Sequence, residues 1–189
     1  VYSCPKCFRE DWLNGYEAMN EDCNDHRFVY MGPAGTFTPL HKDILQSFSW
    51  SVNLCGRKEW VLFPPSEEEC FFDAEGKQLF DLRDVDEVRF PKFKQALKQQ
   101  RRVEQGVHEA IFVPSGWWHQ GGNLEATLSI NHNWLNGANV HWSWKLLREE
   151  AARIKSTVPG CDEDDFTAQE LLEFKFEWDF TAFFRFLCA

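Results

Sequence analysis

The stretch "GTFTPLHKDILQS", residues 35–47, carries a histidine and an aspartate two positions apart. The strand that carries the pair begins within a Gly-, Thr- and Pro-rich approach, so the pair is expected near a strand end. Side chains at i and i+2 of a strand point to the same face. His41 and Asp43 are therefore predicted to face one side and Lys42 the other. Two ligands do not make a metal site, so the interpretation depends on a third residue elsewhere in the chain.

A third candidate ligand, His119, lies in a distant β-rich stretch, "VPSGWWHQ". Two histidines and one carboxylate can cover one face of an octahedral ion and leave the opposite positions open, as non-haem Fe(II) chemistry requires. The competing explanation is chance, because His-x-Asp is a common tripeptide and the chain has six histidines. Other residues must therefore decide between a metal site and a chance occurrence of the tripeptide.

Three polar residues in β-forming surroundings favour the metal site. Lys58 lies seventeen positions after His41, where an ammonium group needs either an anion or, on an edge strand, a route to solvent. Thr38 could add a hydroxyl to the same anion, although threonine is also an ordinary strand residue. Asn131, twelve positions after His119, serves either a bound molecule or a neighbouring backbone group.

The wider sequence is a series of short β-rich runs broken by Gly and Pro. The first four are "RFVYMGP", "TFTPLH", "SFSWSVNL" and "KEWVLFPP". Cys55-Gly56-Arg57 predicts a hairpin turn between the last two. Residues 66–105 are charged and irregular, which indicates an insert with one helical piece, and "HEAIFVPSG" and "ATLSINHNWL" then resume the strands.

Helical patterns flank the strands. A short helix is predicted at "DWLNGYEAM". After Asn136, apolar residues recur every three or four positions on one helix face, namely Val140, Trp144, Leu147, Ala151 and Ile154. Thr167 and Glu170 form a capping-box pattern before a phenylalanine-rich last helix. That helix is too apolar to be solvated and should pack on the β domain or on another subunit.

Charge, apolar runs and cysteine content argue against several classes of protein. Thirty acidic and twenty basic side chains give the 189 residues a net charge of −10, which disfavours nonspecific binding to nucleic acid or to an anionic membrane. No apolar run approaches the roughly 20 residues that span a bilayer. Seven irregularly spaced cysteines favour reduced thiols in the cytoplasm or the nucleus. The chain begins with Val1, so we expect a fragment with a truncated N-terminal part.

Two further patterns carry open interpretations. Cys4, Cys7, Cys23 and His26 have a spacing that suits a structural Zn(II), or they are ordinary thiols and a structural histidine. The acidic run "DEDD" at residues 162–165 could favour a basic substrate, although a solvated loop is the default interpretation.

The segments "TFTPLHKD", "SWSVNLCGRKEWVLFPP" and "VPSGWWHQGGNLEATLSINHNW" together resemble the JmjC family of Fe(II)- and 2-oxoglutarate-dependent oxygenases, over about residues 27–136. They are most similar to the branch that hydroxylates a lysine of a translation termination factor. The resemblance implies that His41, Asp43 and His119 bind the iron. The implied fold is mainly β, a double-stranded β-helix or cupin-like jelly roll at residues 1–136, with C-terminal helices at 137–189 packed on that core.

The resemblance also implies the cosubstrate residues and the reaction. Lys58, helped by Thr38, would bind the distal carboxylate of 2-oxoglutarate, and Asn131 matches a polar position near that cosubstrate. Ser51 stands where some relatives carry asparagine. The expected reaction is hydroxylation of a protein, at a lysine in a basic segment, with O2 as oxidant and ascorbate as reductant. A homodimer through the C-terminal helices is a further expectation, and direct nucleic-acid or membrane binding is not expected.

Three rival functions remain open at this point. An N-methyl-lysine demethylase differs from a hydroxylase only in the carbon that it presents to the metal centre. A non-catalytic JmjC-like binding module would show a broken triad or lack the cosubstrate lysine, and this chain shows neither. A cupin isomerase or storage protein typically uses more histidines and a glutamate soon after the first pair, and residues 44–47 contain none.

Overall fold

The computed structural model describes residues 2–19, 26–158, 160 and 166–189, which group into two compact units. The β unit consists of Arg27–Asp43 and Ser49–His132. The helical unit consists of Val1–His26, Ile44–Phe48 and Asn133–Ala189. The N-terminal segment thus groups with the C-terminal helices, and the expected division between residues 136 and 137 stays a prediction.

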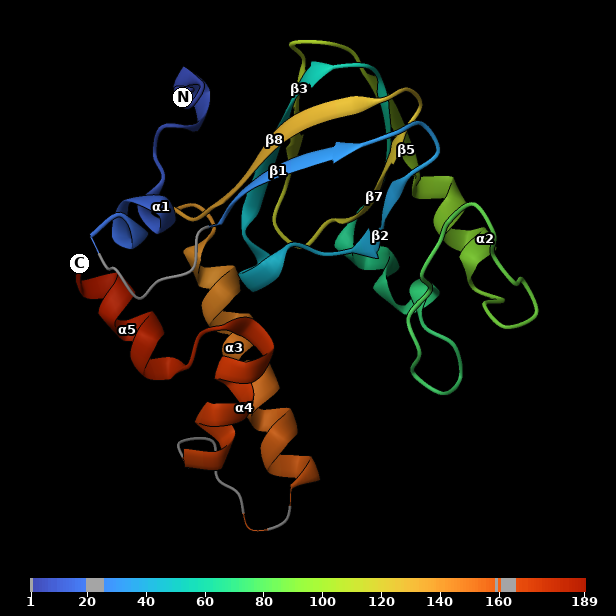
Figure 1. Ribbon diagram of the computed structural model, residues 1–189. Coiled ribbons are helices and arrows are strands. Elements are labelled where there is room, and N and C mark those ends of the chain that lie inside the picture. Colours follow the sequence, from blue (N-terminus) through green and yellow to red (C-terminus); the bar gives the residue numbers. More distant parts are fainter. Residues whose placement is uncertain (1, 20–25, 159, 161–165) are drawn as a thin grey trace. The chain divides into compact units, whose positions relative to one another are not determined.

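The β unit contains two four-stranded sheets, ordered β1-β8-β3-β6 and β2-β7-β4-β5 (Figure 1). The strands are β1 Arg27–Gly32, β2 Phe37–His41, β3 Phe48–Cys55, β4 Lys58–Phe63, β5 Arg101–Gln105, β6 Ala110–Val113, β7 Trp118–Asn123 and β8 Thr127–Trp134. Successive strands mostly switch from one sheet to the other, which is the winding of a double-stranded β-helix. The expected cupin-like jelly roll is confirmed.

The turn at Gly56 differs from the sequence-based expectation. It joins β3 to β4, which belong to different sheets, so the predicted hairpin is wrong. Gly56 has φ of +70°, and a Cβ atom there would lie 2.1 Å from the carbonyl oxygen of Ala126. The turn therefore requires glycine both for its backbone conformation and for the close approach of a neighbouring chain segment.

The insert after β4 covers one face of the second sheet. It holds the 3-10 helices Pro65–Phe71 and Leu97–Gln99 and the short helix α2, Phe93–Ala96. Phe71 and Phe93 pack with Phe63 of β4 and Trp118 of β7 in one buried cluster. The insert is shorter than expected, because residues 101–105 form β5, which pairs with β4 along its length. Alternate residues of β4, such as Trp60 and Leu62, face the opposite side.

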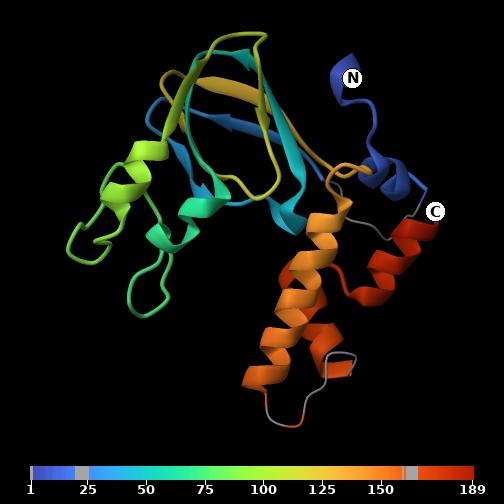
Figure 2. The same ribbon diagram turned by 180° about the vertical axis from the view of Figure 1, so that it is seen from behind.

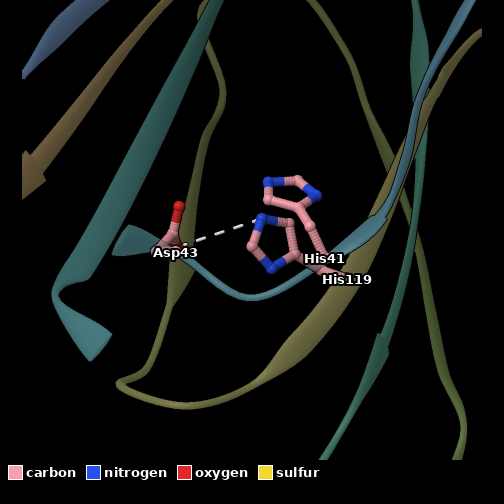
Figure 3. Close-up of side chains that lie close together, drawn as sticks. All are labelled: His41, Asp43 and His119. Carbon is pink, nitrogen blue, oxygen red and sulfur yellow. Dashed lines mark ion pairs between the residues drawn. The ribbon is translucent and has the colours of Figure 1, made fainter. Parts of the chain in front are cut away.

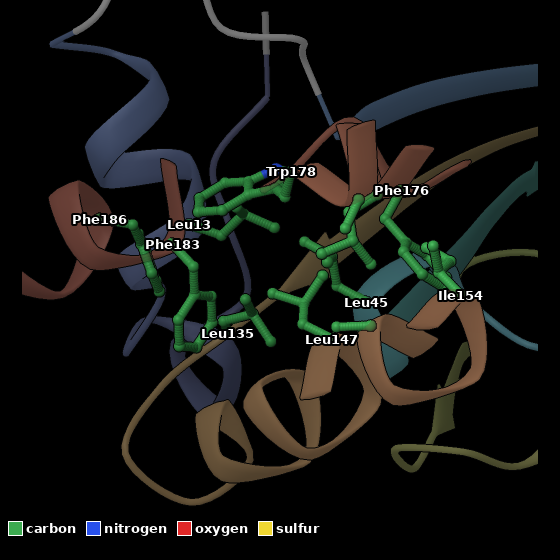
Figure 4. Packing of buried hydrophobic residues seen from close by; sticks show 12 residues of the cluster. Leu13, Leu45, Leu135, Leu147, Ile154, Phe176, Trp178, Phe183 and Phe186 are labelled. Carbon is green, nitrogen blue, oxygen red and sulfur yellow. The ribbon is translucent and has the colours of Figure 1, made fainter. Parts of the chain in front are cut away.

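The helical unit has its own apolar core (Figure 4). Its elements are the 3-10 helices Lys6–Phe8 and Ile44–Gln46, α1 Trp12–Glu17, α3 Val140–Thr157, α4 Phe166–Phe176 and α5 Phe180–Cys188. Figures 1 and 2 both show α4 running alongside α3. The core includes Leu147 and Ile154 from the predicted face of α3. It also includes Leu45, which lies in the segment between β2 and β3.

The predicted single C-terminal helix is in fact two helices. Glu177, with φ of +63°, ends α4, and the Asp179 carboxylate caps α5 by accepting a hydrogen bond from the Ala182 N–H at 2.6 Å. Thr167 lies inside α4, so its predicted role as the N-cap is wrong. None of the described helices is long and apolar enough to cross a membrane.

Candidate metal centre

The three predicted ligands converge inside the β unit (Figure 3). His41 ends β2 and lies directly opposite His119 of β7, and their ring centroids are 4.2 Å apart. Asp43 Oδ2 lies 3.9 Å from His119 Nε2. One ligand atom from each of the three residues lies within 4.8 Å of the other two. This spacing allows a single ion to contact all three side chains.

The reason for the convergence differs from the one that the sequence suggested. Strand β2 ends at His41, so Asp43 is not placed by strand alternation. A register shift between Thr38 and His41 marks a β-bulge in the pairing with β7. Bulges re-aim side chains next to functional sites. The pairing of His41 with His119 is thus set by a bulge, and Asp43 follows in the loop beyond.

Each histidine is oriented by the carbonyl group two residues before it. Because a carbonyl can only accept, His41 Nδ1 donates to Pro39 at 2.8 Å, and His119 Nδ1 donates to Trp117 at 3.2 Å. The Nε2 atoms are left as the candidate metal ligands. Burial lowers the pKa of His119, against the opposing effect of Asp43. The neutral imidazole that a metal needs is therefore favoured.

Lys58 is buried, with 6% of its surface exposed. Its Nζ donates to Ser129 Oγ at 3.1 Å and lies 5.8 Å from the ring centroid of Tyr30 and 5.6 Å from that of Trp60. Burial lowers the pKa of Lys58. No carboxylate forms an ion pair with it within the described part of the chain. The explanation by an edge-strand lysine is therefore wrong, and an anion-binding role fits this environment.

Thr38 and Asn131 lie on two other strands of the β unit, β2 and β8. Thr38 pairs with Gly121 of β7, which in turn pairs with Trp60, two residues beyond Lys58. Asn131 is two residues from Ser129 on β8, so both side chains share one face of that strand. Ser51 Oγ donates to the Asn131 side-chain oxygen at 2.9 Å. Thr38 is thus one strand removed from β4, with β7 between them, and Asn131 lies on β8 of the other sheet, near the Ser129 that Lys58 contacts.

Sequence reasoning missed three residues of this site. Tyr30 and Ser129 contact Lys58, and Ser49 Oγ donates to Asp43 Oδ2 at 2.7 Å. A signal for Ser49 was present, because polar residues alternate through "SWSVN" in β3. Such alternation in a strand whose members are largely buried indicates a polar inner face. For Tyr30 the sequence offered no comparable signal.

The second proposed metal site stays a prediction. Cys23 lies outside the described residues, as does the "DEDD" run at 162–165. The Cys4 thiol donates to the Phe8 carbonyl at 3.3 Å, and the His26 ring pairs with Glu17. These contacts give Cys4 and His26 structural partners in the helical unit.

This chain matches one family of domains and is similar to several known proteins. The model of the cupin-like domain family matches residues 7–139. The "2-oxoglutarate and iron-dependent oxygenase JMJD4" of Danio rerio is 44% identical over 84% of this chain and 38% of its own length. The "Arginine-specific demethylase JMJ20" of Arabidopsis thaliana is 42% identical over 89% of this chain and 40% of its own length. The "Bifunctional arginine demethylase and lysyl-hydroxylase psr-1" of Caenorhabditis elegans is 35% identical over 90% of this chain and 46% of its own length. The chain thus spans less than half the length of each of these relatives.

Proposed function

Because this chain belongs to the family of cupin-like domains, we propose that it is a JmjC-type oxygenase that uses Fe(II) and 2-oxoglutarate to hydroxylate a protein, at a lysine side chain. One observation carries the proposal. The cluster of His41, Asp43 and His119 shares the β unit with Lys58, a buried lysine that forms no ion pair among the described residues. The relatives named as iron- and 2-oxoglutarate-dependent oxygenases support the same reaction class.

The donor set suits ferrous iron. Two imidazole nitrogens and one carboxylate oxygen bind non-haem Fe(II) and leave positions open for a cosubstrate and O2. His41 and His119 would each offer Nε2, because their Nδ1 atoms already donate to carbonyl groups. Bound together, iron and 2-oxoglutarate would supply the oxidation of a C–H bond by O2, coupled to release of succinate and CO2, with ascorbate keeping the iron reduced.

The surroundings of Lys58 suit the distal carboxylate of 2-oxoglutarate. The lysine ammonium would pair with that carboxylate in a buried site, where charge-assisted hydrogen bonds are strong. Thr38 of β2 and Asn131 of β8 would contribute polar contacts along the bound molecule. The protein would hold the cosubstrate through Lys58 and the metal ligands and would exclude water from it.

Turnover of 2-oxoglutarate tests this function. With Fe(II), ascorbate, O2 and a lysine-containing basic peptide, the protein should form succinate, and His41→Ala should abolish it. The matched control is His108→Ala, because His108 lies on the turn before β6 and is not part of the cluster. Wild-type activity in His41→Ala, or equal loss in both variants, would contradict the assignment.

Demethylation of an N-methylated side chain is the second candidate function. Two relatives that are named as arginine demethylases support it. The two reactions differ in the mass of the peptide product. Hydroxylation adds about 16 Da, whereas loss of one methyl group removes about 14 Da. Mass spectrometry on matched lysine, methyl-lysine and methyl-arginine peptides therefore assigns the reaction.

The proposed setting is a reducing compartment, the cytoplasm or the nucleus. The five cysteines that the structure describes are free thiols, which supports this location. Fluorescence microscopy of the tagged protein tests this location.

The protein is also expected not to bind nucleic acid. Binding to an oligonucleotide, measured by fluorescence anisotropy, would contradict this expectation.

We also propose a homodimer through the C-terminal helices. An apolar cavity of about 350 Å³ opens between α3 and α5, and Phe184 on its wall is 66% exposed. Exposed apolar surface of this kind is typical of association sites. Light scattering should give a dimer mass for the wild type and a monomer mass for Phe184→Glu, while a monomeric wild type would contradict the proposal.

A further inference from the structure

The three candidate ligands are held in place by different means. Both histidines donate Nδ1–H to a backbone carbonyl of their own strand or turn, so main-chain geometry fixes their rings. Asp43 lies beyond the end of β2, in a segment without regular strand pairing. Its carboxylate accepts a hydrogen bond at 2.7 Å from Ser49, a residue of a different strand. The aspartate thus depends on a side chain in a way that the histidines do not.

Ser49 is itself rigidly placed. It is 5% exposed, and its backbone pairs with Val113 of β6 in an antiparallel register. Its side chain lies on the same face of β3 as that of Ser51, two residues on. A carboxylate has a broad terminal torsion, so it needs a hydrogen-bond donor to select one orientation. The buried hydroxyl on a central strand provides such a donor.

We propose that Ser49 is a positioning residue that orients the Asp43 carboxylate for metal binding. The inference rests on the proposed function only in taking Asp43 as a metal ligand. Ser49 Oγ donates to Oδ2, the oxygen that also lies 3.9 Å from His119 Nε2. The hydrogen bond therefore fixes the carboxylate relative to the imidazole that would share the ion. Partners of this kind typically change metal affinity by about 10- to 100-fold.

Metal affinity measured without cosubstrate tests the proposal directly. The full chain is titrated anaerobically with Co(II), and binding is followed by visible absorbance. Ser49→Ala should weaken Co(II) binding by about 10- to 100-fold and shift the absorbance bands, because the carboxylate loses a hydrogen bond that orients it. Ser49→Thr, which keeps the hydroxyl, should recover most of the affinity. Thermal unfolding of each metal-free variant shows whether it is folded.

The matched control is Ser51→Ala on the same face of the same strand. Its hydroxyl donates to Asn131 rather than to a candidate ligand, so Co(II) affinity should stay within about twofold of the wild type. An unchanged affinity in Ser49→Ala, or an equal loss in Ser51→Ala, would overturn the role of Ser49 and leave the proposed function intact. If neither the wild type nor Ser49→Ala binds Co(II), both proposals are overturned.

Discussion

At the scale of single residues, Lys58 is expected to lower the stability of the fold while it strengthens the binding of 2-oxoglutarate. Its ammonium group is buried and its pKa is lowered by that burial, so the charged form costs free energy in the fold. Lys58→Met should raise the free energy of unfolding by about 1–3 kcal/mol and weaken 2-oxoglutarate binding by at least about 10-fold. Chemical denaturation and a KM titration measure the two effects. Lys77→Met, at an exposed lysine, should change neither, and a destabilised Lys58→Met would contradict the argument.

Asp81 gives a residue-scale prediction for pH. Hydrogen bonds from Arg83, opposed in part by burial, lower the pKa of its carboxyl from 3.8 to about 2. A carboxylate with a depressed folded pKa stabilises the fold above its unfolded pKa, and this stabilisation is lost as the pH falls from 3.8 to about 2. Because solvent screens this partly exposed ion pair, Asp81→Asn should cost about 1–2 kcal/mol at pH 7, less than the full pKa shift implies. Denaturant titrations at several pH values measure the free energy of unfolding of both proteins. The difference between Asp81→Asn and the wild type should vanish as the pH falls towards about 2. A difference that stays constant with pH would contradict this role of Asp81.

At the scale of elements, what the sequence could predict depended on local chemistry. The metal cluster was predictable because the His-x-Asp pair and the distant histidine are visible as motifs, although the strand alternation expected for Asp43 is wrong. Strand β5 was not, because Arg101, Arg102 and Glu104 are exposed and charged, and such residues predict an irregular insert rather than a strand. Its pairing with β4 is a tertiary effect. The connection at Gly56 looked like a hairpin because a short Gly turn between β-rich runs does not reveal which sheet each run will join.

The turn after Asp43 is an element under strain. Leu45 and Gln46 have φ of 53° and 48°, in the left-handed region that costs a non-glycine residue about 1–2 kcal/mol. Leu45 is fully buried in the helical core, but Gln46 is not. Gln46→Gly should therefore raise the free energy of unfolding by about 0.5–1 kcal/mol, as relief of strain exceeds the entropic cost of glycine. Gln46→Ala keeps the strain and should give no gain in the same denaturation experiment, and equal effects of the two substitutions would contradict this explanation.

At the scale of the whole molecule, the candidate ligands and Lys58 all belong to the β unit, whereas the helical unit has a separate apolar core. A ligand that binds only the folded state stabilises it by about 2.7 kcal/mol at 100 times its Kd. Mn(II) with 2-oxoglutarate, added without ascorbate or Fe(II), should therefore raise the unfolding temperature by roughly 5–10 °C for a chain of this size. Differential scanning calorimetry measures the shift. A chelator should reverse it, and His41→Ala should show almost none of it. If the shift persists in His41→Ala, the stabilising ion binds elsewhere, and the cluster at the end of β2 is not the metal centre.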